Sequence, residues 1–76
     1  MYVRTLQYRD AYGRFSILVE ERPDGSLDLW ELDLPGHSAR RQYVIEKIAA
    51  SLAREGRRLQ VVWGSPRVER KRAQDC

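Results

Sequence analysis

The chain has 76 residues, and its 14 lysines and arginines against 11 aspartates and glutamates give a formal net charge of +3. This length makes a single domain near the lower limit for a chain that folds unaided. No apolar run is long enough to cross a membrane and the N-terminus has no apolar signal core, so we expect a soluble, cytoplasmic protein. The one cysteine, Cys76, leaves no internal disulfide, which fits a reducing compartment.

The first part of the chain predicts a β-hairpin. Residues 2–9 alternate loosely between apolar and polar side chains, and residues 14–22 alternate more clearly, as strands with one buried face do. The sequence Asp10-Ala11-Tyr12-Gly13 between them is typical of a hairpin turn with glycine at positive φ.

A third strand is predicted over residues 27–34, after the turn sequence Arg22-Pro23-Asp24-Gly25-Ser26. Its apolar residues change parity halfway, because Leu27 and Leu29 share one face while Leu32 and Leu34 share the other. A one-residue bulge near Leu29 and Trp30 would bring both sets to the buried face. We therefore expect a bulged strand.

An amphipathic helix is predicted from Ser38, which is a candidate N-cap, to the glycine at position 56, which can end a helix at positive φ. Apolar side chains recur along it at the spacing of one helical face. The apolar residues are Val44, Ile45, Ile48, Ala49, Leu52 and Ala53, of which Ile45, Ile48, Ala49 and Leu52 have this spacing. A last strand follows, in which Leu59, Val61 and Trp63 alternate toward the core.

These elements predict an α+β fold of order β-β-β-α-β, with a single four-stranded, mostly antiparallel sheet and one helix packed on one face. Pairing of the last strand with the first would give the strand order 4-1-2-3. The uncovered face of the sheet would then show Leu18, Val62 and one or more tyrosines. We expect one domain over residues 1–66 and a charged, disordered tail over residues 67–76.

No arrangement of residues in the sequence indicates catalysis, a metal or a cofactor. Cys76 lies at the chain end, and His37 precedes the helix in a loop where an imidazole is usually solvated. Glu31 and Asp33 alternate with leucines, so the solvent face of a strand accounts for them. We expect a protein that is not an enzyme and whose function resides in a binding surface.

The charge is distributed unevenly along the chain. Residues 20–33 carry a net charge of −5, and residues 40–72 carry +7. We predict that the basic residues of the helix and the tail, with one tyrosine, form the binding surface. This set is Arg40, Tyr43, Lys47, Arg54, Arg57, Arg58, Arg67, Arg70, Lys71 and Arg72. A solvated helix face and a solubilising tail are the alternatives for the same residues.

Three functional interpretations remain open from the sequence. The first is a small binding protein that regulates or blocks a macromolecular partner, most simply a protein of complementary charge, like the accessory or inhibitor proteins of phages and mobile elements. The second is a nucleic-acid-binding protein without sequence preference, which uses the basic helix face and tail. The third is a homodimer that associates through the open sheet face.

Two segments resemble known families. Leu32-Asp33-Leu34-Pro35-Gly36, between strands and a helix, resembles a segment of small antitoxin domains with a partial RNase-H-like fold. Residues 54–72 are similar to the end of a small uncharacterised bacterial family. Each resemblance covers a fraction of the chain, and we carry no function from either.

Overall fold

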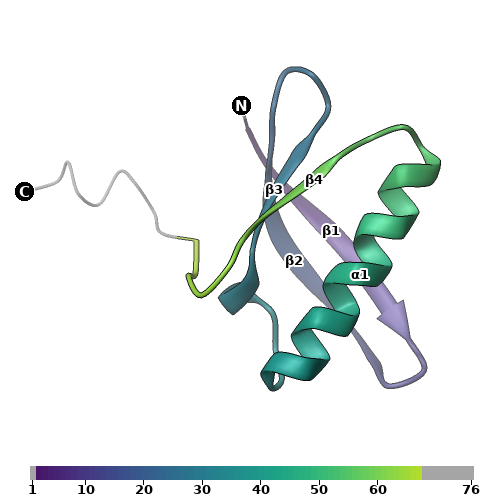
Figure 1. Ribbon diagram of the computed structural model, residues 1–76, viewed down its shortest axis with the longest axis vertical. Helices are drawn as coiled ribbons and strands as arrows, with labels where there is room; N and C mark the ends of the chain where they lie inside the picture. Colours follow the sequence, from purple (N-terminus) through teal and green to yellow (C-terminus); the bar gives the residue numbers. More distant parts are fainter. Residues whose placement is uncertain (1, 68–76) are drawn as a thin grey trace, which may run out of the picture.

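The computed structural model describes residues 2–67 and confirms the α+β fold, with one four-stranded mixed sheet and one helix in this part of the chain (Figure 1). The elements are β1 (Tyr2–Asp10), β2 (Gly13–Glu21), β3 (Leu27–Trp30), the short 3-10 helix η1 (Glu31–Asp33), α1 (Ser38–Arg54) and β4 (Leu59–Val62). Their order along the chain is the predicted one.

The predicted hairpin forms, and it is the longest pairing in the sheet. β1 and β2 pair without interruption from Tyr2 opposite Glu21 to Asp10 opposite Gly13. β2 pairs with β3 only at Glu20 and Glu21. The turn end of the hairpin therefore extends beyond β3, and α1 crosses over this part of the hairpin in Figure 1.

The predicted strand order was wrong. The sheet order is β1-β2-β3-β4, and β4 runs parallel to β3, with Leu27 opposite Leu59. Contacts between the turn before β3 and the turn before β4 favour this pairing. The Leu27 N–H donates to the Arg58 carbonyl at 3.0 Å, and Arg57 Nε donates to the Gly25 carbonyl at 2.9 Å. They start β4 beside β3, which leaves β1 at an edge of the sheet that the described residues form.

The third strand ends in a 3-10 turn, and the predicted bulge is absent. β3 stops at Trp30, and η1 leaves Leu32 44% exposed while it buries Leu34 to 4% exposure. Glu31 lies inside this turn at 8% exposure, so the solvent strand face expected for it was also wrong. Its carboxylate accepts hydrogen bonds from Arg41 Nε at 2.7 Å and from the Gly64 N–H at 2.8 Å. These two donors compensate the burial of its charge and stabilise the turn.

The chain after β4 also departs from expectation. Trp63 lies past the end of β4 and is 59% exposed, because the chain turns at Gly64 with a φ of +72°. Arg67, which we placed in the tail, donates from its backbone N–H to Asp33 at 3.1 Å and from Nε to Glu20 at 3.0 Å. The rest of the predicted tail, residues 68–76, lies outside the described residues.

The core lies between α1 and the sheet face toward it. The apolar residues predicted on the helix contribute to it, except that Ala49 is only half-buried and Ala53 is exposed. The buried apolar side chains are Ile17, Val19, Leu27, Leu29, Leu34, Val44, Ile45, Ile48 and Leu52. The open face shows Leu18 and Val62 as predicted, but Tyr8 packs against the core on the helix side, so the tyrosines expected on that open face are not there.

Both ends of α1 have specific caps. His37, and not Ser38, is the N-cap, and its Nδ1 accepts a hydrogen bond from the Arg40 N–H at 3.2 Å. At the other end, Gly56 has the positive φ that the sequence predicted, +74°. The N–H groups of Gly56 and Arg57 return to the carbonyls of Ala53 and Leu52, which is the hydrogen-bond pattern of a Schellman motif.

Candidate functional site

The predicted binding residues within the described chain separate into two groups. Arg40, Tyr43 and Lys47 lie together near the start of α1, next to the end of β1. Arg54, Arg57 and Arg58 lie around its C-terminal end, and Arg67 is on the far side of the sheet. Arg70, Lys71 and Arg72 lie outside the described residues.

Three of the predicted cations are bound within the molecule. Arg40 pairs with Asp10, Arg57 with Glu21, and Arg67 with Glu20. Such pairs hold the guanidinium groups in place, so these arginines stabilise the fold as well as carry positive charge at the surface. The sequence could not reveal this, because the paired residues are from 30 to 47 positions apart.

Asp10 is the centre of a polar network at the end of β1. Arg40 Nη1 donates to Asp10 Oδ2 at 2.6 Å and Nη2 donates to Oδ1 at 3.0 Å. The Tyr8 hydroxyl donates to Oδ2 at 2.7 Å, and the Tyr12 N–H donates to Oδ1 at 2.9 Å. The Arg40 hydrogen bonds are the main reason that the pKa of Asp10 lies well below its usual range. Burial, together with the hydrogen bond to Asp10, raises the pKa of Tyr8 to about 12.

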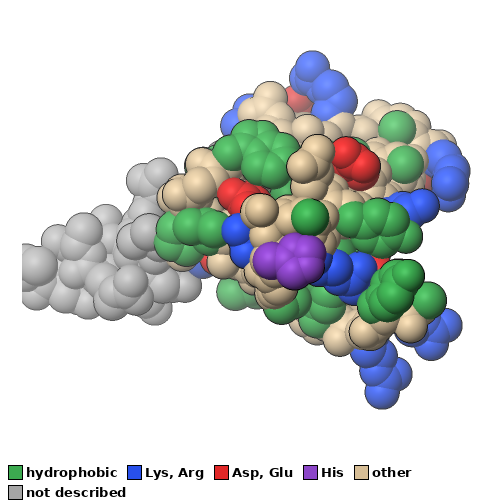
Figure 2. Space-filling view, turned by 60° about the horizontal axis from the view of Figure 1, so that its bottom comes forward, with side chains coloured by type: hydrophobic (Ala, Val, Ile, Leu, Met, Phe, Trp, Pro, Cys, Tyr) green, Lys and Arg blue, Asp and Glu red, His purple; other side chains and the backbone are tan. Residues whose placement is uncertain are grey.

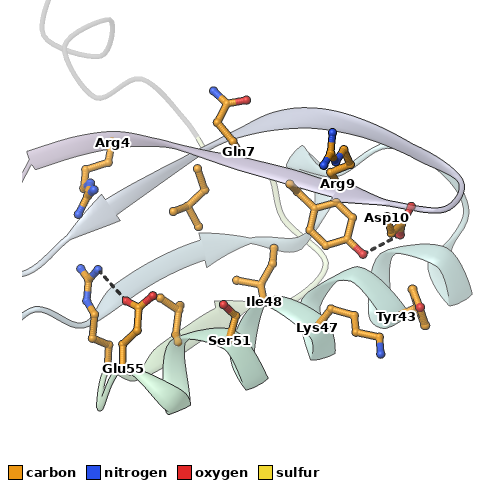
Figure 3. Close-up of a pocket in the computed structure, with 13 residues that line it drawn as sticks. Arg4, Gln7, Arg9, Asp10, Tyr43, Lys47, Ile48, Ser51 and Glu55 are labelled. Atoms are coloured by element: carbon orange, nitrogen blue, oxygen red, sulfur yellow. Dashed lines mark hydrogen bonds and ion pairs between the residues drawn. The ribbon is translucent and has the colours of Figure 1, made fainter.

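A groove of about 510 Å³ runs between the edge strand β1 and α1. Figure 3 shows Ile48 and Ser51 of the helix along its middle, while Gln7 of β1 points away from it. Leu6 and Tyr8 face the groove from the strand, and both are half-buried against the core. We call this space, between residues 4–10 of β1 and residues 43–57, the β1–α1 groove.

The two ends of the β1–α1 groove differ in charge. At the end near the start of β1, Arg4 and Arg57 both bind Glu21, at 2.8 and 3.0 Å, and Glu55 stands 3.9 Å from Arg57. Positive and negative charges balance there, and the hydrogen bond from Arg4 is the first cause that lowers the pKa of Glu21.

At the other end, the charge of Asp10 is neutralised by Arg40, which leaves Lys47 in excess. Lys47 Nζ stands 5.3 Å from the centre of the Tyr43 ring, and no carboxylate among residues 2–67 pairs with it. Figure 3 shows Lys47, Tyr43 and Asp10 gathered at this end. The groove therefore has an apolar middle, a neutral end and a positive end.

A cluster of aromatic and cationic side chains, which we call the Tyr12 corner, adjoins the positive end. Tyr12 of the hairpin turn is 82% exposed, and the Arg40 guanidinium stands 5.5 Å from its ring centre and 5.8 Å from that of Tyr43. In Figure 2 hydrophobic and Lys or Arg side chains surround the purple imidazole of His37, the only histidine of the chain, at this end of the molecule. Sequence reasoning missed Tyr12, since only the fold brings the hairpin turn to the helix.

Other kinds of site find no support in the described part of the chain. Within residues 2–67 no group of three or more His, Cys, Asp or Glu side chains is placed to hold a metal ion. None of the helices there is long and apolar enough to cross a membrane. Comparison of the chain with protein-family models, with curated proteins and with solved structures gave no significant match.

Proposed function

We propose that this chain is a small non-catalytic protein that binds an extended segment of a partner protein along β1, and that it regulates the partner or blocks it by occupying that segment. The observation that carries the proposal is the position of the β1–α1 groove directly beside a long sheet edge that no strand among residues 2–67 pairs with. Such an edge adds a strand from another chain, and an adjacent groove reads the side chains of that strand.

The edge supports this function through its length. β1 has nine residues, all paired with β2, and its other side faces no strand within the described residues. An edge strand leaves alternate backbone N–H and C=O groups without a ladder partner. Nine residues span about 30 Å, which is enough for most strand additions. β4, the opposite edge, has only four residues.

The apolar and charged side chains that line the groove also support the binding of an extended segment. Leu6 and Ile48 supply apolar contact in the middle, and the charged residues lie at the ends, so an alternating peptide would meet a different environment at every second side chain. Affinity would come from the backbone ladder and selectivity from the groove. The surface differs from the one the sequence suggested, since only Tyr43, Lys47 and Arg57 of that set line it.

The test is selection from a displayed library of random peptides of about ten residues, the length that can pair along β1. The variant that blocks the groove is Ser51→Trp, which fills the groove from an exposed helix position and leaves the core intact. Selected peptides are expected to shift the amide NMR signals of β1 and α1 and to lose at least about tenfold in affinity for the variant. Signals that shift instead on the face of Leu18 and Val62 would contradict the proposal.

Nucleic-acid binding is the second candidate, and the Tyr12 corner is the observation that favours it. Exposed aromatic rings beside cations are the elements on which bases stack. Fluorescence anisotropy with labelled single-stranded RNA, single-stranded DNA and duplex DNA over a salt series tests it in the full chain. Tight binding with a steep salt dependence, weakened by Tyr12→Ala, would support this candidate. Arg40 is paired with Asp10, which reduces the positive charge that this corner offers to phosphates, so a protein partner is favoured over a nucleic acid.

A further inference from the structure

We infer that the segment bound in the β1–α1 groove carries an acidic residue two positions before an apolar residue. This inference rests on the proposed function and adds the chemistry of the partner. It depends on three features: the order of environments along the groove, the unpaired charge of Lys47, and the direction in which a strand adds to β1.

The order of environments follows from the alternation of β1. Leu6 and Tyr8 face the groove from successive inward positions, with Ile48 and Leu52 opposite on the helix. Inward positions of an added strand are likewise two residues apart. One inward side chain would therefore lie against Leu6 and Ile48, and the next would lie at the Tyr8 end, within reach of Lys47.

Charge complementarity selects the residue at that second position. Asp10 cannot neutralise Lys47, since its two oxygens already accept from Arg40, Tyr8 and Tyr12. A carboxylate at this position would pair with Lys47. A basic residue would meet the uncompensated charge of Lys47 and is disfavoured. The opposite end, where charges balance, selects for neither sign.

Strand direction decides the order of the two residues. Antiparallel pairs are somewhat more stable for each residue than parallel pairs and outnumber them. A segment antiparallel to β1 enters at the Asp10 end, so it passes Lys47 before it reaches Leu6. The acidic residue therefore precedes the apolar one.

The probe is a capped threonine-rich peptide with Glu two positions before Ile, titrated into the full chain by calorimetry at low and moderate salt. Matched peptides carry Lys in place of Glu or Ser in place of Ile. The protein variant is Lys47→Glu, and its control is Arg54→Glu, which makes the same charge change on α1 outside the groove. Lys47→Glu is expected to lower the affinity for the Glu peptide about five- to tenfold, and Arg54→Glu is expected to leave that affinity unchanged. The difference in affinity between the two variants should shrink as the salt concentration rises. The Lys peptide is expected to prefer the Lys47→Glu protein.

Two further peptides separate the failure of this inference from the failure of the proposed function. They carry N-methyl groups on alternate backbone nitrogens, one peptide in each of the two possible frames. Strand addition to β1 tolerates one frame and loses the other, because only alternate N–H groups face the sheet edge. If the affinity depends on the frame of methylation but not on the peptide's Glu or on Lys47, the acidic motif is wrong and strand addition is retained. If the affinity is the same for both frames, or if a homodimer protects the β1 amides, both the acidic motif and strand addition by a partner are wrong.

Discussion

Arg40 of α1 and Asp10 at the end of β1 form a two-pronged ion pair, with hydrogen bonds of 2.6 and 3.0 Å. This pair attaches the turn end of the β1–β2 hairpin, which extends beyond β3, to the start of the helix. It also sets the charge at one end of the β1–α1 groove, because it leaves Lys47 without a carboxylate among residues 2–67.

The pair predicts a loss of stability in acid. The pKa of Asp10 is lowered in the folded state, chiefly by Arg40, so its contribution to stability is present above the ordinary value of 3.8 and is lost as the pH falls below it. Thermal unfolding from pH 7 into this acid range should show a falling midpoint. Asp10→Asn should lower the midpoint at pH 7 and flatten the acid loss. Glu46→Gln, at an exposed helix position, is the control; an Asp10→Asn protein with the wild-type midpoint would contradict the role of the pair.

Tyr8 predicts a second loss of stability at high pH. Its pKa is raised to about 12, first by burial and then by the hydrogen bond to Asp10, so the folded state favours the neutral phenol. That preference is fully present below pH 10, the ordinary value, and disappears as the pH rises toward 12. The pKa of Tyr2 is also raised, first by its hydrogen bond with Glu21, so the titration uses Tyr2→Phe as the background. Ultraviolet titration of Tyr2→Phe should show a tyrosine that ionises late, and adding Tyr8→Phe should remove it. A late-titrating tyrosine that persists in the double variant Tyr2→Phe and Tyr8→Phe would show that another residue is responsible.

The end of α1 predicts a purely conformational cost at Gly56. Its φ is +74°, and a β-carbon added there would have no neighbour within 4 Å. Gly56→Ala should therefore cost about 1–2 kcal/mol, the penalty of a left-handed residue with a side chain. Gly56→Asn should cost less, because asparagine tolerates this conformation better. Chemical denaturation of the two variants gives both values, and a loss in Gly56→Asn as large as that in Gly56→Ala would contradict the role of the left-handed conformation.

The turn after β3 predicts opposite outcomes for two neighbouring leucines. Leu34 is buried, and Leu34→Ala should cost about 2–5 kcal/mol through lost burial and the cavity it leaves. Leu32 is largely exposed, and Leu32→Ala should change stability by no more than about 0.5 kcal/mol. Denaturant midpoints measure both. A large loss for both variants would instead favour a continuous bulged strand with both leucines inside.

The buried carboxylate of Glu31 predicts a local effect on the loop after β4. Its Oε1 accepts from the Gly64 N–H, and its Oε2 accepts from Arg41. Glu31→Ala should speed amide hydrogen exchange at Gly64 by more than about tenfold, because that donor loses its partner. Asp33→Ala, which removes the acceptor of the Arg67 N–H instead, is the matched control. Equal exchange at Gly64 in both variants would contradict this role for Glu31.

Sequence patterns were sufficient to predict the elements whose causes are local. The helix with its buried Val44, Ile45, Ile48 and Leu52 follows from spacing along one face. The end at Gly56 and the β1–β2 hairpin follow from turn chemistry within a few residues. These features need no knowledge of distant parts of the chain.

The remaining features could not be predicted in this way, because they depend on contacts between residues far apart in the sequence. The strand order was set by Arg57 and Arg58 meeting the turn before β3, and the end of β3 by Glu31 meeting Arg41 and Gly64. The same kind of long-range contact pairs Arg40, a predicted binding residue, with Asp10. The groove beside β1 exists because β4 pairs elsewhere and leaves that edge open, and no local pattern records such a choice of partner.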